Sequence, residues 1–274
     1  MEIIAASFED RILYQNKACM VINKLPGESS EISAIVMCEK GEMPSETGGA
    51  IIVGDKSILF PVHRLDTPVS GCLLLAKKKE SAAFLSEVFA GPASEEAAEV
   101  EKLYWAIIEK PKEGYELPNE AELVHWLYEN KKINKSFAYP FSDTLPYLHG
   151  SSREDKSHKE PVFNGKYIKP KKAVLRYRII GEGERYLFLE IRLVTGRHHQ
   201  IRAQLASIGL HIKGDLKYGA RRSEKGGGIR LHAFSLVFPN PLNSYETVRV
   251  KAPPPLEDSL WRCFAEAASI DDMR

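Results

Sequence analysis

Residues 63–71 read HRLDTPVSG and run directly into the apolar segment 71–77, GCLLLAK. The apolar segment has the length and composition of a fully buried strand, and the Pro and Gly residues before it are typical of a turn. One carboxylate, Asp66, therefore lies between a basic pair and the buried strand. A turn aspartate ordinarily bonds the nearby backbone, so the stretch alone leaves both a structural and a chemical role open.

Around this strand, the hydrophobic pattern predicts many strands and few helices. Strands are expected at 18–24, 71–77, 102–110, 173–180, 185–195, 230–238 and 246–253, and helices at 80–90, 197–208 and 256–267. Segment 123–130 could form a further strand, whereas 28–57 carries little signal and 142–160 is a polar loop. The pattern predicts an α+β fold with a long mixed, mainly antiparallel sheet and few flanking helices.

Length and charge set broad limits on function. The chain has 274 residues and a net charge of +1, which fits one large domain or two small ones and does not by itself indicate a nucleic-acid binder. The basic residues are unevenly distributed, because 166–178 holds six Lys or Arg and no acid, and 213–230 holds six against two acids. Such segregation can build one basic face, although two solvated loops would give the same pattern.

The four cysteines lie far apart without a CxxC pair, so neither a disulfide framework nor a zinc site is expected. Cys19 and Cys72 lie in apolar runs and are expected in the core. The N-terminal residues lack the apolar core of a signal peptide, and no apolar run has the length of a membrane span. A cytoplasmic protein without a membrane or metal partner is expected.

The predicted helix 197–208 gives the first indication that Asp66 has a partner. At about 100° per residue, Arg202 lies at the edge of the apolar stripe of this helix, and Arg197 lies near the stripe one turn earlier. An arginine held against a core without a carboxylate partner costs roughly 3–5 kcal/mol. Spacing alone does not tell whether such a pair is structural or functional.

Several segments in a fixed order place Asp66 in a wider context. HRLDTPVSG, KLYWA, LVTGRHHQIRAQL, GDLKYG and LHAFSLVFPNP follow one another, and ILYQNKACMVINKLPG precedes them. Together they resemble RNA pseudouridine synthases of the large-ribosomal-RNA type over residues 11–252, although 28–57 and 112–170 contribute little. Val69 and the sequence KLPG depart from the family's usual Thr and Lys-Pro-x-Gly. One catalytic domain is expected over 1–274, with its core at 11–252 and no separate N-terminal RNA-binding module.

The resemblance implies a pseudouridine synthase fold, whose sheet forms two lobes with a central cleft. It implies isomerisation of specific uridines in structured RNA, with ribosomal RNA the first expectation and tRNA the second. In this reaction the bond from C1′ to N1 breaks, and the uracil turns and rejoins the sugar through C5. The reaction requires no cofactor and no metal. The partner is RNA, and a monomer is expected.

The resemblance also assigns roles to three residues. Asp66 would be the catalytic carboxylate, which either attacks C1′ or takes a proton from C2′. Arg202 would keep that carboxylate ionised, with Arg197 as the weaker candidate. Tyr104 would lie against the uracil, where it could stack or accept the C5 proton.

Further residues are expected to bind RNA. Arg64 and His63 would support extrusion of the target nucleotide from a helix, although a packed, hydrogen-bonded His63 fits the sequence as well. The candidates for contacts to the RNA backbone are Arg197, Lys213, Lys217, Arg221 and Arg222.

Two other functions are compatible with parts of the pattern. The same fold could serve as a non-catalytic RNA-binding or ribosome-assembly factor, but such a factor has no need of Asp66, Tyr104 and Arg202 together. A carboxylate glycosidase needs a second carboxylate to activate water, and the sequence nominates none. The enzyme is therefore the favoured interpretation.

Overall fold

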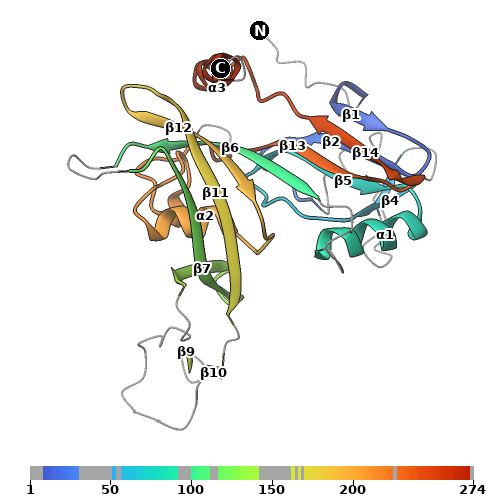
Figure 1. Cartoon of the computed structure of the whole chain (residues 1–274), viewed down its shortest axis with the longest axis horizontal. Coiled ribbons are helices and arrows are strands. Elements are labelled where there is room, and N and C mark those ends of the chain that lie inside the picture. Colours follow the sequence, from blue (N-terminus) through green and yellow to red (C-terminus); the bar gives the residue numbers. More distant parts are fainter. Residues whose placement is uncertain are drawn as a thin grey trace. The chain divides into compact units, whose positions relative to one another are not determined.

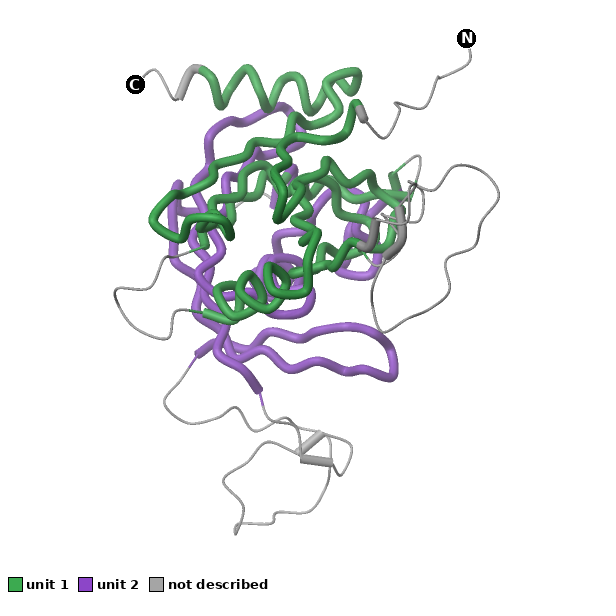
Figure 2. The backbone as a smooth tube through the Cα atoms, turned by 90° about the vertical axis from the view of Figure 1, so that its right-hand side faces the viewer, with its two compact units in different colours: residues 1–106, 224–274 green, residues 107–223 purple. Residues whose placement is uncertain are grey.

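The computed structural model describes residues 9–30, 51–53, 57–91, 100–111, 117–141, 162–163, 166–167, 170–224 and 227–271. The chain divides into two compact units (Figure 2): unit 1 comprises residues 1–106 and 224–274, and unit 2 comprises residues 107–223. Strand β6 (Glu101–Glu109) begins in unit 1 and ends in unit 2. The expectation of one catalytic domain over the whole chain stays a prediction.

Unit 1 is built on a mixed sheet with the strand order β1-β2-β5-β13-β6, in which β14 pairs with β13 and β4 with β5 (Figure 1). The strand bounds are β1 Ile12–Gln15, β2 Cys19–Lys24, β3 Ile51–Val53, β4 Ser57–Pro61, β5 Ser70–Ala76, β13 Leu231–Asn240 and β14 Asn243–Lys251. A short 3₁₀ helix, η1 (Glu9–Arg11), precedes β1. The pair β5–β13 is parallel, and the other described pairs of the unit are antiparallel.

Strand β5 lies at the centre of this sheet, and all seven of its residues are buried. The predicted cysteine positions are confirmed, because Cys19 and Cys72 both lie in the core cluster that also holds Leu74 and Phe238. Helix α1 (Lys79–Ala90) contributes the buried Leu85 to the same cluster. This burial explains why the strand after residue 70 is continuously apolar.

The C-terminal helix α3 (Ser259–Asp271) packs on the aromatic residues of unit 1. Its Phe264 ring stacks on Trp105 with centroids 4.5 Å apart, and Trp105 in turn stacks on Phe234 at 3.7 Å. Trp261 is 2% exposed. The helix is thus part of the unit's core packing, which its apolar positions in the sequence predict.

A close approach of two strands requires Gly71. Its φ is +111°, and a Cβ atom added there would lie 2.3 Å from the carbonyl oxygen of Ala233 on β13. Ala233 pairs with Gly71 on one side and with Tyr104 of β6 on the other. The glycine therefore lets β5, and the loop that leads into it, approach the strand next to Tyr104.

Unit 2 contains an antiparallel sheet with the order β12-β11-β7-β8. Its elements are β7 Glu120–Asn130, β8 Lys135–Pro140, β9 Val162–Phe163, β10 Lys166–Tyr167, β11 Lys171–Glu182, β12 Tyr186–Leu193, helix α2 Gln200–Ser207 and the 3₁₀ helix η2 Leu216–Tyr218. Helix α2 packs on β7 and β8, and its buried Gln204 amide donates to the carbonyl oxygens of Leu123 and Ala173 at 3.0 and 3.3 Å.

These elements confirm the predicted α+β class, with three α-helices in the described ranges. Helix α2 begins at Gln200, three residues later than predicted, because His199 has a left-handed backbone (φ 52°) and the Gln200 side chain accepts the Arg197 N–H. Strand β8 was not predicted. The predicted polar loop 142–160 lies outside the described residues.

Candidate active site

The loop that carries Asp66 is held from both sides by backbone hydrogen bonds within unit 1. Ser30 Oγ donates to the Leu65 carbonyl at 2.7 Å and accepts the Leu65 N–H at 2.9 Å. The Gly27 N–H donates to the Thr67 carbonyl at 2.8 Å, and the Ile229 N–H donates to the Pro68 carbonyl at 3.0 Å. A turn bond from the Val69 N–H to the Asp66 carbonyl closes the loop. The carboxylate therefore projects from a backbone of fixed geometry.

A buried lysine that the sequence did not single out joins this loop to the preceding turn. Lys24 is 0% exposed, and its ammonium donates to the carbonyl oxygens of Leu25, Glu28 and Thr67 at 2.9, 2.8 and 3.2 Å. These three acceptors match its three donors. Burial lowers the pKa of Lys24 to about 8. The negative charges of Glu28 and Asp66 oppose this decrease, and the positive charge of Arg11 adds to it. Lys24 therefore lies close enough to Asp66 for their charges to interact.

His63 has a structural role in this arrangement. Its Nε2 accepts the Leu74 N–H at 3.0 Å, and its ring stacks on Phe89 with centroids 4.8 Å apart. Burial and the charge of Lys102 lower the pKa of His63 to about 3. A neutral ring that accepts at Nε2 fits the packed, hydrogen-bonded alternative left open by the sequence. Arg64, next in the chain, is exposed.

Tyr104 lies on β6, where its side chain is 9% exposed. Burial raises the pKa of the Tyr104 phenol, and the charges of Asp66 and Cys72 raise it further. Asp66 is thus within electrostatic reach of Tyr104, as the resemblance implies. The phenol remains protonated at neutral pH because its pKa lies above the ordinary value of ~10.

The start of β5 is fixed by a buried hydrogen bond between Ser70 and His232. Ser70 Oγ lies 2.8 Å from His232 Nδ1, and His232 Nε2 lies 3.0 Å from the Ala252 carbonyl. Because a carbonyl only accepts, Nε2 carries the proton and Nδ1 accepts from the serine hydroxyl. Burial lowers the pKa of His232 to about 4, so the ring is neutral. The pair anchors the C-terminal end of the Asp66 loop.

Within unit 2, Arg202 is buried and fixed by a carboxylate of the GDLKYG segment. Its Nε and Nη2 donate to the two carboxylate oxygens of Asp215 at 2.6 and 2.8 Å, with Asp215 1% exposed. Such two-bond pairs fix the plane of the guanidinium. The pairing of Arg202 with Asp66, or of Arg197 with Asp66, stays a prediction.

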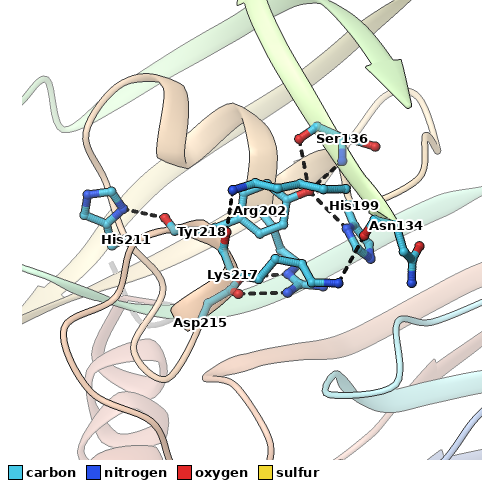
Figure 3. A network of polar contacts seen from close by, with 9 residues as sticks. Asn134, Ser136, His199, Arg202, His211, Asp215, Lys217 and Tyr218 are labelled. Atoms are coloured by element: carbon cyan, nitrogen blue, oxygen red, sulfur yellow. Dashed lines mark hydrogen bonds and ion pairs between the residues drawn. The ribbon is translucent and has the colours of Figure 1, made fainter. Parts of the chain in front are cut away.

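Tyr218 is the second support of Arg202 (Figure 3). Its ring lies 4.9 Å from the guanidinium carbon of Arg202. Its hydroxyl accepts the Ser136 N–H at 2.9 Å, lies 3.1 Å from the Ser136 carbonyl and lies 3.0 Å from His199 Nδ1. Burial, together with the charge of Arg202, lowers the pKa of His199 to about 3. Arg202 is therefore held by the Asp215 carboxylate and packs on the ring of Tyr218.

The structure places the remaining predicted residues on unit 2 as follows. Arg197 is exposed, and its Nε donates to the Lys172 carbonyl at 3.2 Å. Lys213 Nζ lies 5.8 Å from the centre of the Tyr186 ring. Lys217 and Arg222 are exposed. These positions fit surface contacts and leave the RNA-binding role of each residue a prediction.

The two basic segments are partly neutralised by carboxylates of other strands. Arg176 pairs with Glu122 at 2.7 Å, and Arg221 lies 3.7 Å from a carboxylate oxygen of Glu109. Arg230, the last residue of the second segment, pairs with Asp258 at 2.6 Å. A count along the sequence overestimates the basic character of these segments, because it does not see acids that pair across the sheet.

The residues that sequence reasoning missed are Lys24, Asp215 and Tyr218. Asp215 and Tyr218 lie in GDLKYG, a segment that carries the resemblance, but from the sequence only its lysine, Lys217, is named as a candidate RNA contact. A buried aspartate beside a buried arginine can be detected only when both are placed in the fold.

No helix in the described part of the chain is long and apolar enough to cross a membrane.

Comparison with known proteins agrees with the resemblance. The family model described as RNA pseudouridylate synthase matches residues 19–207. An uncharacterized RNA pseudouridine synthase of Zymomonas mobilis is 31% identical over 228 residues, which cover 82% of this chain and 86% of the relative. A tRNA pseudouridine synthase C of Haemophilus ducreyi is 32% identical over 214 residues and 74% of each chain.

The fold agrees as well. The structure of human RNA pseudouridylate synthase domain containing 4 matches with a TM-score of 0.59 and 21% identity, over 95% of this chain and 92% of that one. The family implied by the sequence segments is confirmed. The chain therefore belongs to the RNA pseudouridylate synthase family and is an isomerase that acts on uridine in RNA.

Proposed function

We propose that Asp66 is the catalytic carboxylate of this isomerase and that it acts on a nucleotide turned out of structured RNA. The observation that carries the proposal is the loop 63–69, whose backbone is bonded to three other segments while its single carboxylate lies within electrostatic reach of Tyr104. Fixed geometry of this kind is what a reacting group needs, because a misplaced group loses much of its rate advantage.

The reaction needs one carboxylate. Cleavage of the C1′–N1 bond develops positive charge on the sugar, which the Asp66 carboxylate stabilises, or captures in a C1′–oxygen bond that breaks again when C5 attacks C1′. The uracil leaves as an anion, stays in the site, turns, and forms the C5–C1′ bond. The proton on C5 is then lost and N1 gains one, so no atom leaves the RNA overall. A hydrolase, in contrast, needs a second carboxylate to activate water.

Tyr104 is proposed to lie against the uracil. A phenol whose pKa is raised by burial and by Asp66 is not ionised at neutral pH, which favours stacking and positioning over transfer of the C5 proton to a phenolate. Its position on β6 is set by backbone pairing with Ala233 of β13.

Arg202 is the proposed partner that keeps Asp66 ionised. A guanidinium bonded to Asp215 and packed on the Tyr218 ring is held in one orientation. Arg197 is the weaker choice because its side chain is exposed and its Nε is bonded to the Lys172 carbonyl.

The RNA substrate is proposed to be a structured RNA, either ribosomal RNA or tRNA. One similar protein is named for tRNA, which makes tRNA the first substrate to test. Arg64, exposed beside Asp66, is proposed to take the space that the turned-out nucleotide leaves or to contact its phosphate. The expected cytoplasmic location stays a prediction.

The proposal is tested by tritium release from transcripts that contain uridine labelled at C5, using a tRNA set and a ribosomal RNA set. Wild type is expected to release tritium, and Asp66→Asn is expected to release none while unfolding at the same urea midpoint. The control Glu80→Gln removes a carboxylate from the exposed start of α1 and is expected to keep full activity. Undiminished turnover by folded Asp66→Asn would falsify the assignment.

A further inference from the structure

The hairpin between β7 and β8 presents a cluster of exposed lysines at its tip. Its tip reads Lys131-Lys132-Ile133-Asn134-Lys135, and the first four of these residues are exposed. The side chain of Ile133 is 53% exposed, although isoleucine side chains are ordinarily buried. The segment had attracted no functional prediction from the sequence.

The tip is tied to η2 by reciprocal bonds (Figure 3). Lys135 Nζ donates to the Lys217 carbonyl at 2.6 Å, and Lys217 Nζ donates to the Asn134 carbonyl at 3.1 Å. Lys135 Nζ also lies 4.9 Å from the centre of the Tyr218 ring. The exposed Leu216 and Lys217 therefore lie beside the hairpin and continue its surface.

We define the tip surface as Lys131, Lys132, Ile133, Leu216 and Lys217. Within the described ranges, no carboxylate forms an ion pair with its three lysines; the nearby Glu129 lies 4.0 Å from His198 instead. The surface thus combines concentrated positive charge with two exposed aliphatic side chains. The lysine charges attract phosphate groups, and the two aliphatic side chains can pack on ribose or base faces.

We propose that the tip surface binds the phosphate backbone of the RNA substrate, as a contact area of unit 2. The proposal rests on the proposed function only in taking RNA as the partner. Its connection to the site runs through η2, because Tyr218 bonds the Ser136 backbone at the base of the tip and packs on Arg202. Within unit 2, Tyr218 therefore links the base of the tip to Arg202.

The test compares two double substitutions that remove equal charge. Lys131→Gln with Lys132→Gln alters the tip, and Lys78→Gln with Lys79→Gln alters an adjacent pair of exposed lysines on unit 1. Binding of fluorescein-labelled unfractionated tRNA is measured between about 0.05 and 0.3 M KCl. Loss of two phosphate contacts reduces the slope of log K against log salt by roughly 1.4–1.8 and weakens binding roughly 10–50-fold at about 0.1 M salt.

The expected result is that the tip variant shows this loss while the control stays within about twofold of wild type. Tritium release should show a raised KM with kcat within about twofold, because the tip does not touch the reacting atoms. Unfolding midpoints confirm that both variants are folded.

The proposal is overturned if the tip variant binds like wild type, or if the control weakens binding equally, since the effect would then come from net charge alone. If wild type isomerises uridine and the tip variant binds tRNA like wild type, the RNA-binding role of the tip surface is refuted and the proposed catalysis is not. If wild type binds tRNA through the tip but forms no pseudouridine in any RNA, the proposed catalysis is refuted and the RNA-binding role of the tip surface is supported.

Discussion

Replacement of Lys24 by methionine offers a quantitative test of the buried ammonium that joins the Asp66 loop to the turn before it. Its pKa is about 8 in the folded protein, against 10.5 for a free lysine side chain. Between these values the folded state binds fewer protons than the unfolded state, so stability from this group rises with pH. Below about pH 8 the ammonium is charged in both states, and its burial cost is fully present.

The magnitude follows from the shift. The pKa difference between 10.5 and about 8 corresponds to roughly 3–4 kcal/mol at about 1.4 kcal/mol per pKa unit. Lys24 is 0% exposed, so solvent screening does not reduce this figure. Relative to the Lys24→Met variant, the unfolding free energy of wild type should therefore rise from its value at pH 7 by roughly 1–2 kcal/mol at pH 9 and by roughly 2–3 kcal/mol at pH 10.

The assay is urea unfolding of wild type and variant at several pH values from 7 to 10, with Lys77→Met, which removes a lysine directly after β5, as the control. Titration of the lysine side chain by NMR gives an independent value, expected near ~8, and does not require the variant to fold. A wild-type advantage that is constant over this range, or that shrinks as the pH rises, would refute the reasoning.

Two further predictions concern packing around the site. Gly71→Ala should destabilise unit 1 by roughly 2–4 kcal/mol, because the new Cβ atom would lie 2.3 Å from the Ala233 carbonyl oxygen at a φ of +111°. Thermal unfolding measures this, with Gly183→Ala, whose Cβ would meet its nearest atom at 3.7 Å, as a control expected to change little. Asp215→Asn should cost roughly 3–5 kcal/mol and most of the tritium release, since it leaves the Arg202 charge buried beside a neutral amide. Urea unfolding with unchanged stability would contradict a tight Arg202–Asp215 pair.

Much of the fold was predictable because it depends on local patterns. The buried strand β5 and the helices α1 and α3 follow from runs and periodicities of apolar residues. Strand β8 escaped prediction because its six residues alternate weakly and owe their conformation to pairing with β7. The late start of α2 depends on the left-handed backbone of His199, for which the adjacent histidines give no sign.

The site was predictable only in part, for a related reason. Asp66, Tyr104 and Arg202 are nominated through segments that resemble a family; the family is confirmed, and the role of each residue stays a prediction. Lys24 and Asp215 were missed because a charged residue in a sequence is ordinarily read as exposed. Their burial becomes visible only when carbonyl oxygens or a guanidinium from another part of the chain are placed beside them.

The bond between the His63 ring and the Leu74 N–H has a consequence for how this protein can vary. Strand β5 pairs with β13 at its start and with β4 at its end. Between these two pairings, the His63 imidazole accepts the hydrogen bond of the Leu74 N–H. A hydrogen bond thereby joins the two ends of the segment from 63 to 74. Inserted residues would have to break that bond, so we expect this loop to vary in its side chains, such as the exposed Arg64, rather than in its length.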